Sequence, residues 1–530
     1  MNPLRSSRLR NALPGLIVLA LASCAGPQAT AGMIAVVAHA DGITHSVDVP
    51  SGSTVQQALA QAGIGLGPLD RVAPPGYTVL TEGVEITVTR VLERFEVQTV
   101  AIPFEHQTIR NESLPEGETR LLQAGSNGIQ QVTYRILEEE GVEMSRAPVQ
   151  TVVVQEPLSE IVMVGAQAAY APLEIEGTLA YLSGGNAWVM RDTSGGRRPL
   201  VVSGDLDGRI FRLSPDGLWL LFTRHGEEDE GVINTLWAVS TTEADAEPVD
   251  LNVANVVHFA DWAPTSPPLT IAYSTVEPSP SAPGWQANND LRLLTFNPLG
   301  FATRRRVLIE PNAGGQYGWW GTSFAWGSSG TLAYARADSI GTVELSDPFF
   351  TPLLEITPLQ TLGDWAWVPG IAWGRDGRSI YFIDHGTPLS LEDPAASPVF
   401  NLVAMPGPGA PTLSLSPQTG MFSQPVVSPA IELPSGEDSY LVAYLQALAP
   451  LESADSRYRL AVVDRDGSNA RTLFPPPGES GLEPQAVIWS PDGARIALVY
   501  RGDLWVVDVA SGSGQPLTGD GQTVLVDWMP

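Results

Sequence analysis

Short apolar runs alternate with turn residues from residue 172 to the C-terminus, and this alternation is the main pattern of the chain. It is clearest near the end, where the run Ala486–Ser490 leads into the turn Pro491–Gly493. Apolar runs then recur at Arg495–Val499, Asp503–Asp508 and Gln515–Thr518. Proline presets φ at the first turn position and glycine accepts a positive φ, so the runs are predicted to be short strands joined by tight turns. A unit this small buries its faces only by stacking on copies of itself.

The opening strand of this unit recurs along the array. The copies are Ile210–Gly217, Phe259–Pro264, Phe324–Gly327, Ile371–Gly377, Val426–Pro429, Ile488–Gly493 and Val524–Pro530. Their spacing, roughly 40–65 residues, is typical of propeller blades with loop insertions. We therefore predict a mainly β protein with a seven-bladed β-propeller over residues 172–530, six or eight blades being the alternatives.

The two ends of the array are complementary. Val524–Pro530 is an opening strand with no later strands after it. The first region has later strands, around Leu179–Tyr181, Ala187–Asp192 and Pro199–Val201, and no opening strand. We therefore expect the C-terminal strand to complete the first blade, which would leave no sheet edge unpaired.

Strands that run up and down place their connections alternately on two faces. One face is expected to carry the tight turns Asp216-Gly217, Asp376-Gly377, Asp492-Gly493, Asp466-Gly467 and Ser194-Gly195. The other face, called here the elaborated face, is expected to carry the long connections 224–232, 275–289, 384–398 and 445–457 and the inter-blade loops 310–322 and 363–369. Loops on a rigid scaffold commonly present binding residues. The Ser-Pro-Asp-Gly signature (Ser214–Gly217, Ser490–Gly493) resembles the Pro-Asp repeats of TolB-like propellers, which are related in shape to WD-repeat propellers.

Residues 33–91 form a first small module. Two strands, Met33–Ala40 and Thr44–Val49, are predicted to join at Asp41-Gly42, a strong hairpin signal. A helix over 53–63, capped by Ser53 or Thr54, and a strand at Val84–Val91 complete a β-grasp-like pattern. The module resembles the small domain repeated in YabE-type and resuscitation-promoting cell-wall proteins, through Asp41-Gly42, Thr54-Val55, Asp70–Val72 and Gly83–Ile86.

Residues 92–166 have the alternation of half-exposed strands, at Glu96–Pro103, Gly128–Leu137 and Val149–Val154. The segment resembles the G-five domain through Ala101–Glu105, Leu114–Gly117, Gln123–Gly125, Gln131–Tyr134 and Glu160–Gly165. The resemblance implies a thin, elongated β module of bacterial surface proteins that binds N-acetylglucosamine-containing polymers and carries no catalytic residues. The alternative is a stiff spacer.

The N-terminus predicts export. Arg5, Arg8 and Arg10 precede an apolar stretch over 12–22, too short to span a membrane and typical of a signal peptide. The ending Leu21–Cys24 resembles the lipobox of bacterial lipoproteins, which implies a signal peptide over 1–24, cleavage before Cys24, a lipid anchor on its thiol and a tether over 25–32. The alternative is an ordinary signal peptide followed by an incidental cysteine. We expect a lipid-anchored protein at the cell membrane or cell surface.

Composition narrows the choice of partners. The 530 residues include 29 Lys+Arg and 58 Asp+Glu, a net charge of −29. Nucleic-acid affinity rests on neutralising phosphates with Lys and Arg, so no nucleic-acid partner is expected. The single cysteine excludes an intrachain disulfide.

Candidate chemistry is sparse, and we expect no catalytic residues, no metal site and no cofactor. The six histidines are scattered without metal-ligand spacing, and no nucleophile elbow or phosphate-binding glycine loop is present. The acidic loop Glu227–Glu230 could bind calcium, although a solvated charge run is the commoner use. An enzyme acting on extracellular glycan, or a purely structural scaffold, are the alternatives to a binding protein.

Aromatic residues in the elaborated-face loops are the candidate ligand-binding residues: Trp285, Tyr317, Trp319, Trp320 and Trp365. Rings on a loop-rich surface suit stacking against sugars or capture of a protein partner. The alternative is that they pack between neighbouring sheets, as tryptophans at blade starts usually do. The sequence therefore predicts a binding protein of the cell envelope, with peptidoglycan or another N-acetylglucosamine-containing glycan and a protein as candidate partners.

Overall fold

The fold is that of a computed structural model, which describes residues 32–530 except 112–113, 115–117, 166–169, 227–230, 265–268, 298, 300–301, 362 and 433–437. Its architecture is mainly β, as predicted. The chain divides into two compact units. The first comprises residues up to Glu105 together with Gly125–Ser159, and the second comprises His106–Ala124 and Glu160–Pro530.

The first unit begins with the predicted β-grasp-like module. Its elements are β1 (Met33–Ala40), β2 (Ile43–Pro50), α1 (Val55–Gln61), β3 (Arg71–Ala73) and β4 (Glu85–Thr89). The sheet order is β2-β1-β4-β3, with β1 and β4 parallel. Asp41 and Gly42 both have a positive φ, which matches the twist of a tight hairpin.

Helix α1 begins where the sequence predicts. The Thr54 side chain accepts a hydrogen bond from the Gln57 N–H, and the Gln57 side chain accepts one from the Thr54 N–H at 2.9 Å. This capping box satisfies two N–H groups that the helix leaves free. Val55, Ala58 and Leu59 are buried against the sheet, so these three residues form the face through which the helix packs.

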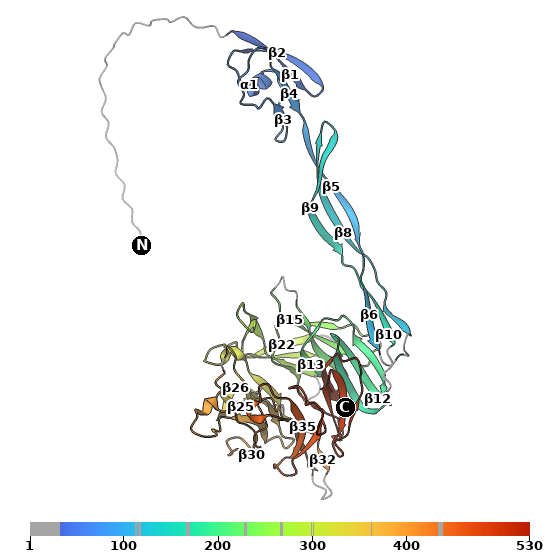
Figure 1. The fold of residues 1–530 in the computed structure, drawn as a ribbon, viewed down its shortest axis with the longest axis vertical. Helices are drawn as coiled ribbons and strands as arrows, with labels where there is room; N and C mark the ends of the chain where they lie inside the picture. The colour runs from blue at the N-terminus through green and yellow to red at the C-terminus, as the bar shows by residue number, and fades with distance from the viewer. Residues whose placement is uncertain are drawn as a thin grey trace, which may run out of the picture. The chain divides into compact units, whose positions relative to one another are not determined.

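The rest of the first unit is a single-layer sheet of long strands (Figure 1), in the order β5-β8-β9. The strands are β5 (Val91–Ile102), β8 (Gly128–Glu139) and β9 (Val142–Gln155). Because no second layer covers it, many apolar side chains are exposed, among them Phe95, Val142 and Met144. The sheet is held along its length by backbone pairing and by ion pairs such as Arg94–Glu138.

The second unit starts with a smaller sheet of β6 (His106–Asn111), β10 (Glu160–Gly165) and β7 (Thr119–Gln123). β10 lies between the other two, parallel to β6 and antiparallel to β7. Ile109, Ile161 and Met163 belong to one hydrophobic cluster with Ile175 and Leu179, so this sheet shares its core with the start of the propeller.

The propeller sheets of the described chain are six four-stranded sheets and one three-stranded sheet. The first four-stranded sheet consists of β13 (Leu206–Leu213), β14 (Trp219–His225), β15 (Asn234–Ser240) and β16 (Val249–Ala254). The second consists of β17 (Ala260–Trp262), β18 (Leu269–Tyr273), β21 (Leu291–Phe296) and β22 (Ala302–Ile309). The third consists of β23 (Ser323–Trp326), β24 (Leu332–Ala335), β25 (Ser339–Glu344) and β26 (Asp347–Glu355). Each of them opens on a segment that the sequence analysis identified.

The fourth sheet consists of β27 (Ile371–Trp373), β28 (Ile380–His385), β29 (Phe400–Met405) and β30 (Leu413–Ser416). The fifth consists of β31 (Val426–Val427), β34 (Leu441–Ala447), β35 (Tyr458–Asp464) and β36 (Arg471–Phe474). The sixth consists of β37 (Ile488–Trp489), β38 (Arg495–Tyr500), β39 (Asp503–Asp508) and β40 (Gly514–Pro516). The predicted turn glycines Gly217, Gly377, Gly467 and Gly493 all have a positive φ. Four of the five predicted tight turns are thus confirmed.

The three-stranded sheet closes the array, as predicted. It has the order β12-β11-β41, where β11 is Glu174–Ser183, β12 is Asn186–Val201 and β41 is Thr523–Met529. Leu179 pairs with Trp528, and Figure 1 shows the C-terminus beside β12. The C-terminal strand therefore supplies the opening strand that the first blade lacks.

Two details of the array differ from prediction. Ser194-Gly195 is not a tight turn: both residues lie inside β12, which continues to Val201, so this blade has three strands instead of four. The tight-turn face is also not bare, because the β31–β34 connection contains the short strands β32 (Ile431–Glu432) and β33 (Asp438–Ser439). Hydrophobic pattern alone cannot tell a strand that continues through Ser-Gly from one that turns there.

The long predicted connections do link second to third strands. They contain the hairpin β19 (Val276–Pro278) and β20 (Trp285–Ala287), and the short helices η3 (Pro394–Ala396) and η4 (Pro450–Glu452). The inter-blade loop before β23 contains η2 (Gly318–Trp320). In the described part of the chain, no helix has the length and apolar character needed to cross a bilayer.

Candidate functional site

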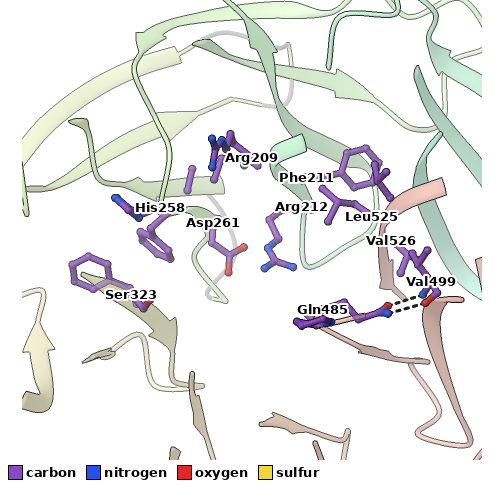
Figure 2. A pocket seen from close by; sticks show the side chains of 17 residues that line it. Arg209, Phe211, Arg212, His258, Asp261, Ser323, Gln485, Val499, Leu525 and Val526 are labelled. Carbon is purple, nitrogen blue, oxygen red and sulfur yellow. Dashed lines mark hydrogen bonds between the residues drawn. The ribbon is translucent and has the colours of Figure 1, made fainter. Parts of the chain in front are cut away.

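The opening strands of several blades converge on one cavity of about 320 Å³ (Figure 2). Its walls come from β13, β17, β23, β41 and the segment 484–486 that precedes β37. The residues from β17, β23 and β41 lie at the starts of those strands. Each opening strand starts at the face that carries the inter-blade loops, so the cavity lies toward the elaborated face.

Two arginines of β13, Arg209 and Arg212, contribute guanidinium groups to the cavity. Arg209 is exposed and Arg212 is half-buried. Neither side chain has an ion pair within 4.0 Å in the described part of the chain. Figure 2 shows Arg212 and Asp261 pointing toward one another into the cavity. The two guanidinium groups of the cavity are therefore free of direct ion pairs in the described residues.

Asp261, on β17, is the cavity's carboxylate. Its Oδ1 accepts a hydrogen bond of 2.8 Å from the Trp262 N–H. Burial raises the pKa of Asp261 to about 6, against the lowering effect of Arg212 and with a further rise from the charge of Asp527. Asp261 therefore changes protonation state near neutral pH, which few carboxylates do.

Asp527, on β41, lies beside this group and is almost fully buried, with 2% of its surface exposed. Its Oδ2 accepts a hydrogen bond of 2.7 Å from the Leu213 N–H, and its Oδ1 accepts one of 3.0 Å from the Trp528 N–H. Burial raises the pKa of Asp527, and Arg212 opposes that rise. Arg212 is thus the positive charge that lowers the pKa of both carboxylates.

His258 connects the cavity to the aromatic loops. Its Nε2 is buried without a hydrogen-bond partner in the described residues. Burial, and then the charge of Arg209, lower its pKa to about 4, so the imidazole is neutral at physiological pH. A Cβ at Gly321 would lie 2.7 Å from Nε2, so glycine is required there for the ring to hold its place.

The aromatic rings beside His258 come from two elaborated-face loops. Trp285 of β20 packs edge-on against His258 with the ring centroids 4.5 Å apart. Trp320 of η2 packs edge-on against Trp285 at 6.5 Å. Trp285 and Trp320 are both half-buried, so part of each ring remains accessible. We call Trp285, Trp320 and His258 the aromatic cluster.

The five predicted aromatic residues thus separate into two groups. Trp285 contacts both His258 and Trp320, and Tyr317 and Trp319 lie next to or in η2, in the same loop as Trp320. Trp365 lies instead in the next inter-blade loop, 41% exposed, and its backbone N–H bonds to the Gly363 carbonyl at 2.9 Å. The structure brings together two of the five and places Trp365 in a different loop.

Packing between sheets accounts for other tryptophans. Trp262 and Trp489 are buried, and their Nε1 groups donate hydrogen bonds of 3.1 Å to the carbonyls of Arg212 and Val426 in the preceding blade. Trp367 is buried in the same way, donating to the Met421 carbonyl at 3.0 Å. Trp262 and Trp489, on the opening strands β17 and β37, therefore link neighbouring blades, while Trp326 and Trp373 are half-buried and their Nε1 groups have no partner in the described residues.

Four polar cavity residues were missed by the sequence analysis: Arg209, Arg212, His258 and Asp261. The available signal was a charged or titratable side chain inside an otherwise apolar opening strand, as in Arg209–Arg212 and His258–Asp261. Such residues are costly to bury unless they are paired or used. Within the described ranges, no group of three or more His, Cys, Asp and Glu side chains could hold a metal ion. Cys24 and Glu227–Glu230 lie outside the described residues.

Comparison with known proteins identifies the modules before the propeller. Residues 93–167 match the G5 domain, and residues 37–76 match the G5-linked ubiquitin-like domain. The resuscitation-promoting factor RpfB of Mycolicibacterium smegmatis is 30% identical over 111 residues, which cover 21% of this chain and 30% of RpfB. These matches confirm both predicted resemblances, and the chain spans less than a third of the length of RpfB.

Solved structures are similar to separate parts of the chain. The IgA1 protease G5 domain is 30% identical, with 15% of this chain and 94% of that chain covered and a TM-score of 0.13. The β-propeller domain of the Trilobed protease from Pyrococcus furiosus is 10% identical, with 79% and 96% covered and a TM-score of 0.37.

Proposed function

We propose that this protein is a non-catalytic binding protein of the cell envelope. It is exported, anchored to the membrane by lipid on Cys24, and binds cell-wall glycan of the N-acetylglucosamine type through its G5 region. The propeller binds a protein or glycan partner through its elaborated face. The G5 match and the similarity to a resuscitation-promoting factor support an extracellular, envelope-associated role.

One observation carries the propeller half of this proposal: the aromatic cluster stands beside a cavity on the face that carries the long loops. Trp285 and Trp320 are half-buried, so part of each ring remains accessible. Accessible tryptophan next to a concave polar site is the usual arrangement for stacking on a sugar ring or anchoring a partner side chain.

The test uses the full chain and purified peptidoglycan. We expect Trp285→Ala and Trp320→Ala to reduce retention on peptidoglycan or on a glycan array by about tenfold, in line with the loss of an aromatic anchor. Phe349→Ala is the matched control, because Phe349 is 67% exposed on the outer strand β26. Retention that is unchanged in both tryptophan variants would contradict the propeller half of the proposal.

The G5 and anchoring halves need separate measurements. Retention that survives both tryptophan substitutions and is competed by N-acetylglucosamine oligomers would assign glycan binding to the G5 region. Loss of all retention in those variants would make that region a spacer. Cys24→Ser is expected to move the protein from the membrane fraction to the soluble one, because the thiol is the attachment point for the lipid.

A second candidate function is glycan hydrolysis. The observation that favours it is the pair Asp261, half-buried, and Asp527, buried, two carboxylates with raised pKa values that share Arg212. Glycosidases use such a pair as acid and base or nucleophile. Release of reducing ends from peptidoglycan that disappears in Asp261→Asn would establish this activity. Intact glycan after prolonged incubation would leave binding as the function.

A further inference from the structure

We propose that the propeller cavity binds the carboxylate of an acidic sugar, held by the guanidinium groups of Arg209 and Arg212 while the aromatic cluster stacks on the sugar ring. The inference deepens the proposed function and rests on its propeller half. It specifies the ligand class: a monosaccharide unit that carries one carboxylate, such as a muramic acid or a uronic acid.

The first argument is the charge of the cavity. This chain has twice as many acidic residues as basic ones, 58 against 29, yet two of its arginines line one cavity without an ion pair in the described residues. Arginine offers donors in a planar fork that matches a carboxylate. The two guanidinium groups come from the same strand, three positions apart, with Ile210 and Phe211 between them in the wall.

The second argument is the unpartnered histidine nitrogen. His258 lines the cavity, and its buried Nε2, which lies against Gly321, has no hydrogen-bond partner in the described chain. Leaving such an atom unsatisfied costs about 1–3 kcal/mol. A ligand hydroxyl or carboxylate at this point would remove that cost. The Gln485 amide is not available to a ligand in this way, because it already exchanges two hydrogen bonds of 2.7 Å with the backbone of Val499 (Figure 2).

The third argument selects a carboxylate over other charged groups. A metal cation would be repelled by Arg209 and Arg212, and a phosphate dianion would be repelled more strongly than a monoanion by the ionised carboxylate of Asp261. A protonated Asp261 can donate a hydrogen bond to a carboxylate oxygen. The cavity volume of about 320 Å³ is at the small end for ligand sites, which suits one sugar unit.

The cavity should also make binding depend on pH. The charged and titratable groups around Asp261 are Arg212 and Arg209 on β13, His258 in the loop just before β17 and Asp527 on β41. His258 is neutral above about pH 4 because burial lowers its pKa to about 4. Asp261 loses its proton as the pH rises through about 6, since burial raises its pKa to that value. An anionic ligand should therefore bind more weakly at alkaline pH.

The test is isothermal titration of the full chain with four probes: N-acetylmuramic acid, glucuronic acid, N-acetylglucosamine and inorganic phosphate. We expect the two acidic sugars to bind at least about tenfold more tightly than N-acetylglucosamine, as one charge-assisted hydrogen bond would give. Phosphate should be the weakest probe. The ratio between the two acidic sugars distinguishes a wall-derived source from a uronic acid source.

Variants separate recognition of the ligand carboxylate from binding of the sugar ring. Arg212→Gln is expected to remove the tenfold preference for the acidic sugars over N-acetylglucosamine. Arg209→Gln should act in the same direction, and because Arg209 is exposed, its loss does not endanger folding. Arg378→Gln is the control, an exposed arginine in the tight turn between β27 and β28. Circular dichroism and melting curves verify that each variant is folded.

Three results would overturn the inference. Equal affinity for N-acetylmuramic acid and N-acetylglucosamine would show that the site does not recognise the ligand carboxylate. In that case, loss of binding in Trp285→Ala would still support the proposed function. Phosphate binding as tight as the acidic sugars would indicate an unselective anion site. Absence of binding by any of the four probes, together with unchanged peptidoglycan retention in the tryptophan variants, would defeat both proposals.

Discussion

The carboxylate of Asp527 accepts a 2.7 Å hydrogen bond from the backbone N–H of Leu213, a residue 314 positions earlier in the chain. Asp527 itself pairs with Ala180 through the backbone of β41. One residue near the C-terminus therefore binds the first blade through its backbone and the second blade through its side chain. This links blade closure to the cavity, because Leu213 ends the strand that carries Arg209 and Arg212.

Closure of the ring predicts a large cost for Trp528→Ala. The indole is 3% exposed, belongs to the cluster shared with Leu179, and donates a 2.6 Å hydrogen bond to the Glu176 carbonyl. We expect the free energy of unfolding to fall by about 3–5 kcal/mol, measured in urea by tryptophan fluorescence. Val524→Ala, at a 57% exposed position of the same strand, should change it by less than about 0.5 kcal/mol. Equal effects of the two substitutions would mean that β41 does not hold the ring together.

Asp261 predicts a pH-dependent stability. The pKa of Asp261 is raised to about 6 by burial, so the native state binds a proton more tightly than the unfolded state, and native stability falls as the pH rises from the unfolded pKa toward 6. Asp261→Asn removes that penalty. We expect it to stabilise the protein by on the order of 2 kcal/mol at about pH 8 and to have little effect at about pH 4.

Thermal melting at several pH values would measure this difference. Asp364→Asn, at an exposed loop position, provides the control and should leave the melting temperature unchanged at every pH. A stabilisation by Asp261→Asn that stays constant from acid to alkaline pH would show that the Asp261 carboxyl does not titrate in the native protein.

Asp70 predicts the opposite pH dependence in the first module. Burial by itself would raise the pKa of Asp70, but hydrogen bonds from the Gly67 N–H, the Arg90 guanidinium and the Val91 N–H together lower it. The stabilisation is therefore present above the unfolded pKa and is lost as the pH falls through the lower native value. We expect Asp70→Asn to cost about 1–3 kcal/mol at neutral pH.

Hydrogen exchange of residues 33–91 would report this change locally, since the protein has more than one cooperative unit. Asp48→Asn, an exposed position on β2, is the control. Protection lost equally in both variants, or unchanged in Asp70→Asn, would contradict a structural role for the Arg90–Asp70 pair. The same arginine forms two hydrogen bonds, of 2.7 and 2.8 Å, with Asp41.

Gly128 predicts a steric limit in the G5 region. A Cβ at this position would lie 2.5 Å from the Gln155 carbonyl oxygen and 2.6 Å from the Pro157 nitrogen, both backbone atoms that cannot move aside alone. We expect Gly128→Ala to destabilise the first unit by about 1–3 kcal/mol, measured by limited proteolysis. The control is Gln130→Ala, two residues further along β8. Gly141→Ser would not be a clean control, because Gly141 has a positive φ. Similar proteolysis rates for both variants would contradict the steric argument.

The resemblance motifs of the first module acquire a physical explanation in the structure. Asp41 and Asp70 belong to separate motifs in the sequence, yet both bind Arg90. Local patterns predicted the hairpin, the helix cap and the strands, because turn chemistry and capping act over a few residues. They could not predict that three distant charged residues converge, since such a contact depends on how the strands pack.

The same division holds for the propeller. Short apolar strands, Pro-Asp-Gly turns and the unmatched ends of the array were sufficient to predict a closed ring with β41 beside β11. They were not sufficient for Ser194-Gly195, where the strand continues, because glycine and serine permit a turn without requiring one.

The sequence by itself determined the modules, the order of the strands and the face that carries the long loops, because hydrophobic period and turn residues are local properties. Only the tertiary structure decided which side chains share the cavity. Arg212 lies on β13, Asp261 lies on β17 and His258 lies just before β17, so they meet only because neighbouring blades pack side by side. Their burial, their charge balance and the meeting of Trp285 with Trp320 all depend on contacts between blades, which no single stretch of sequence encodes.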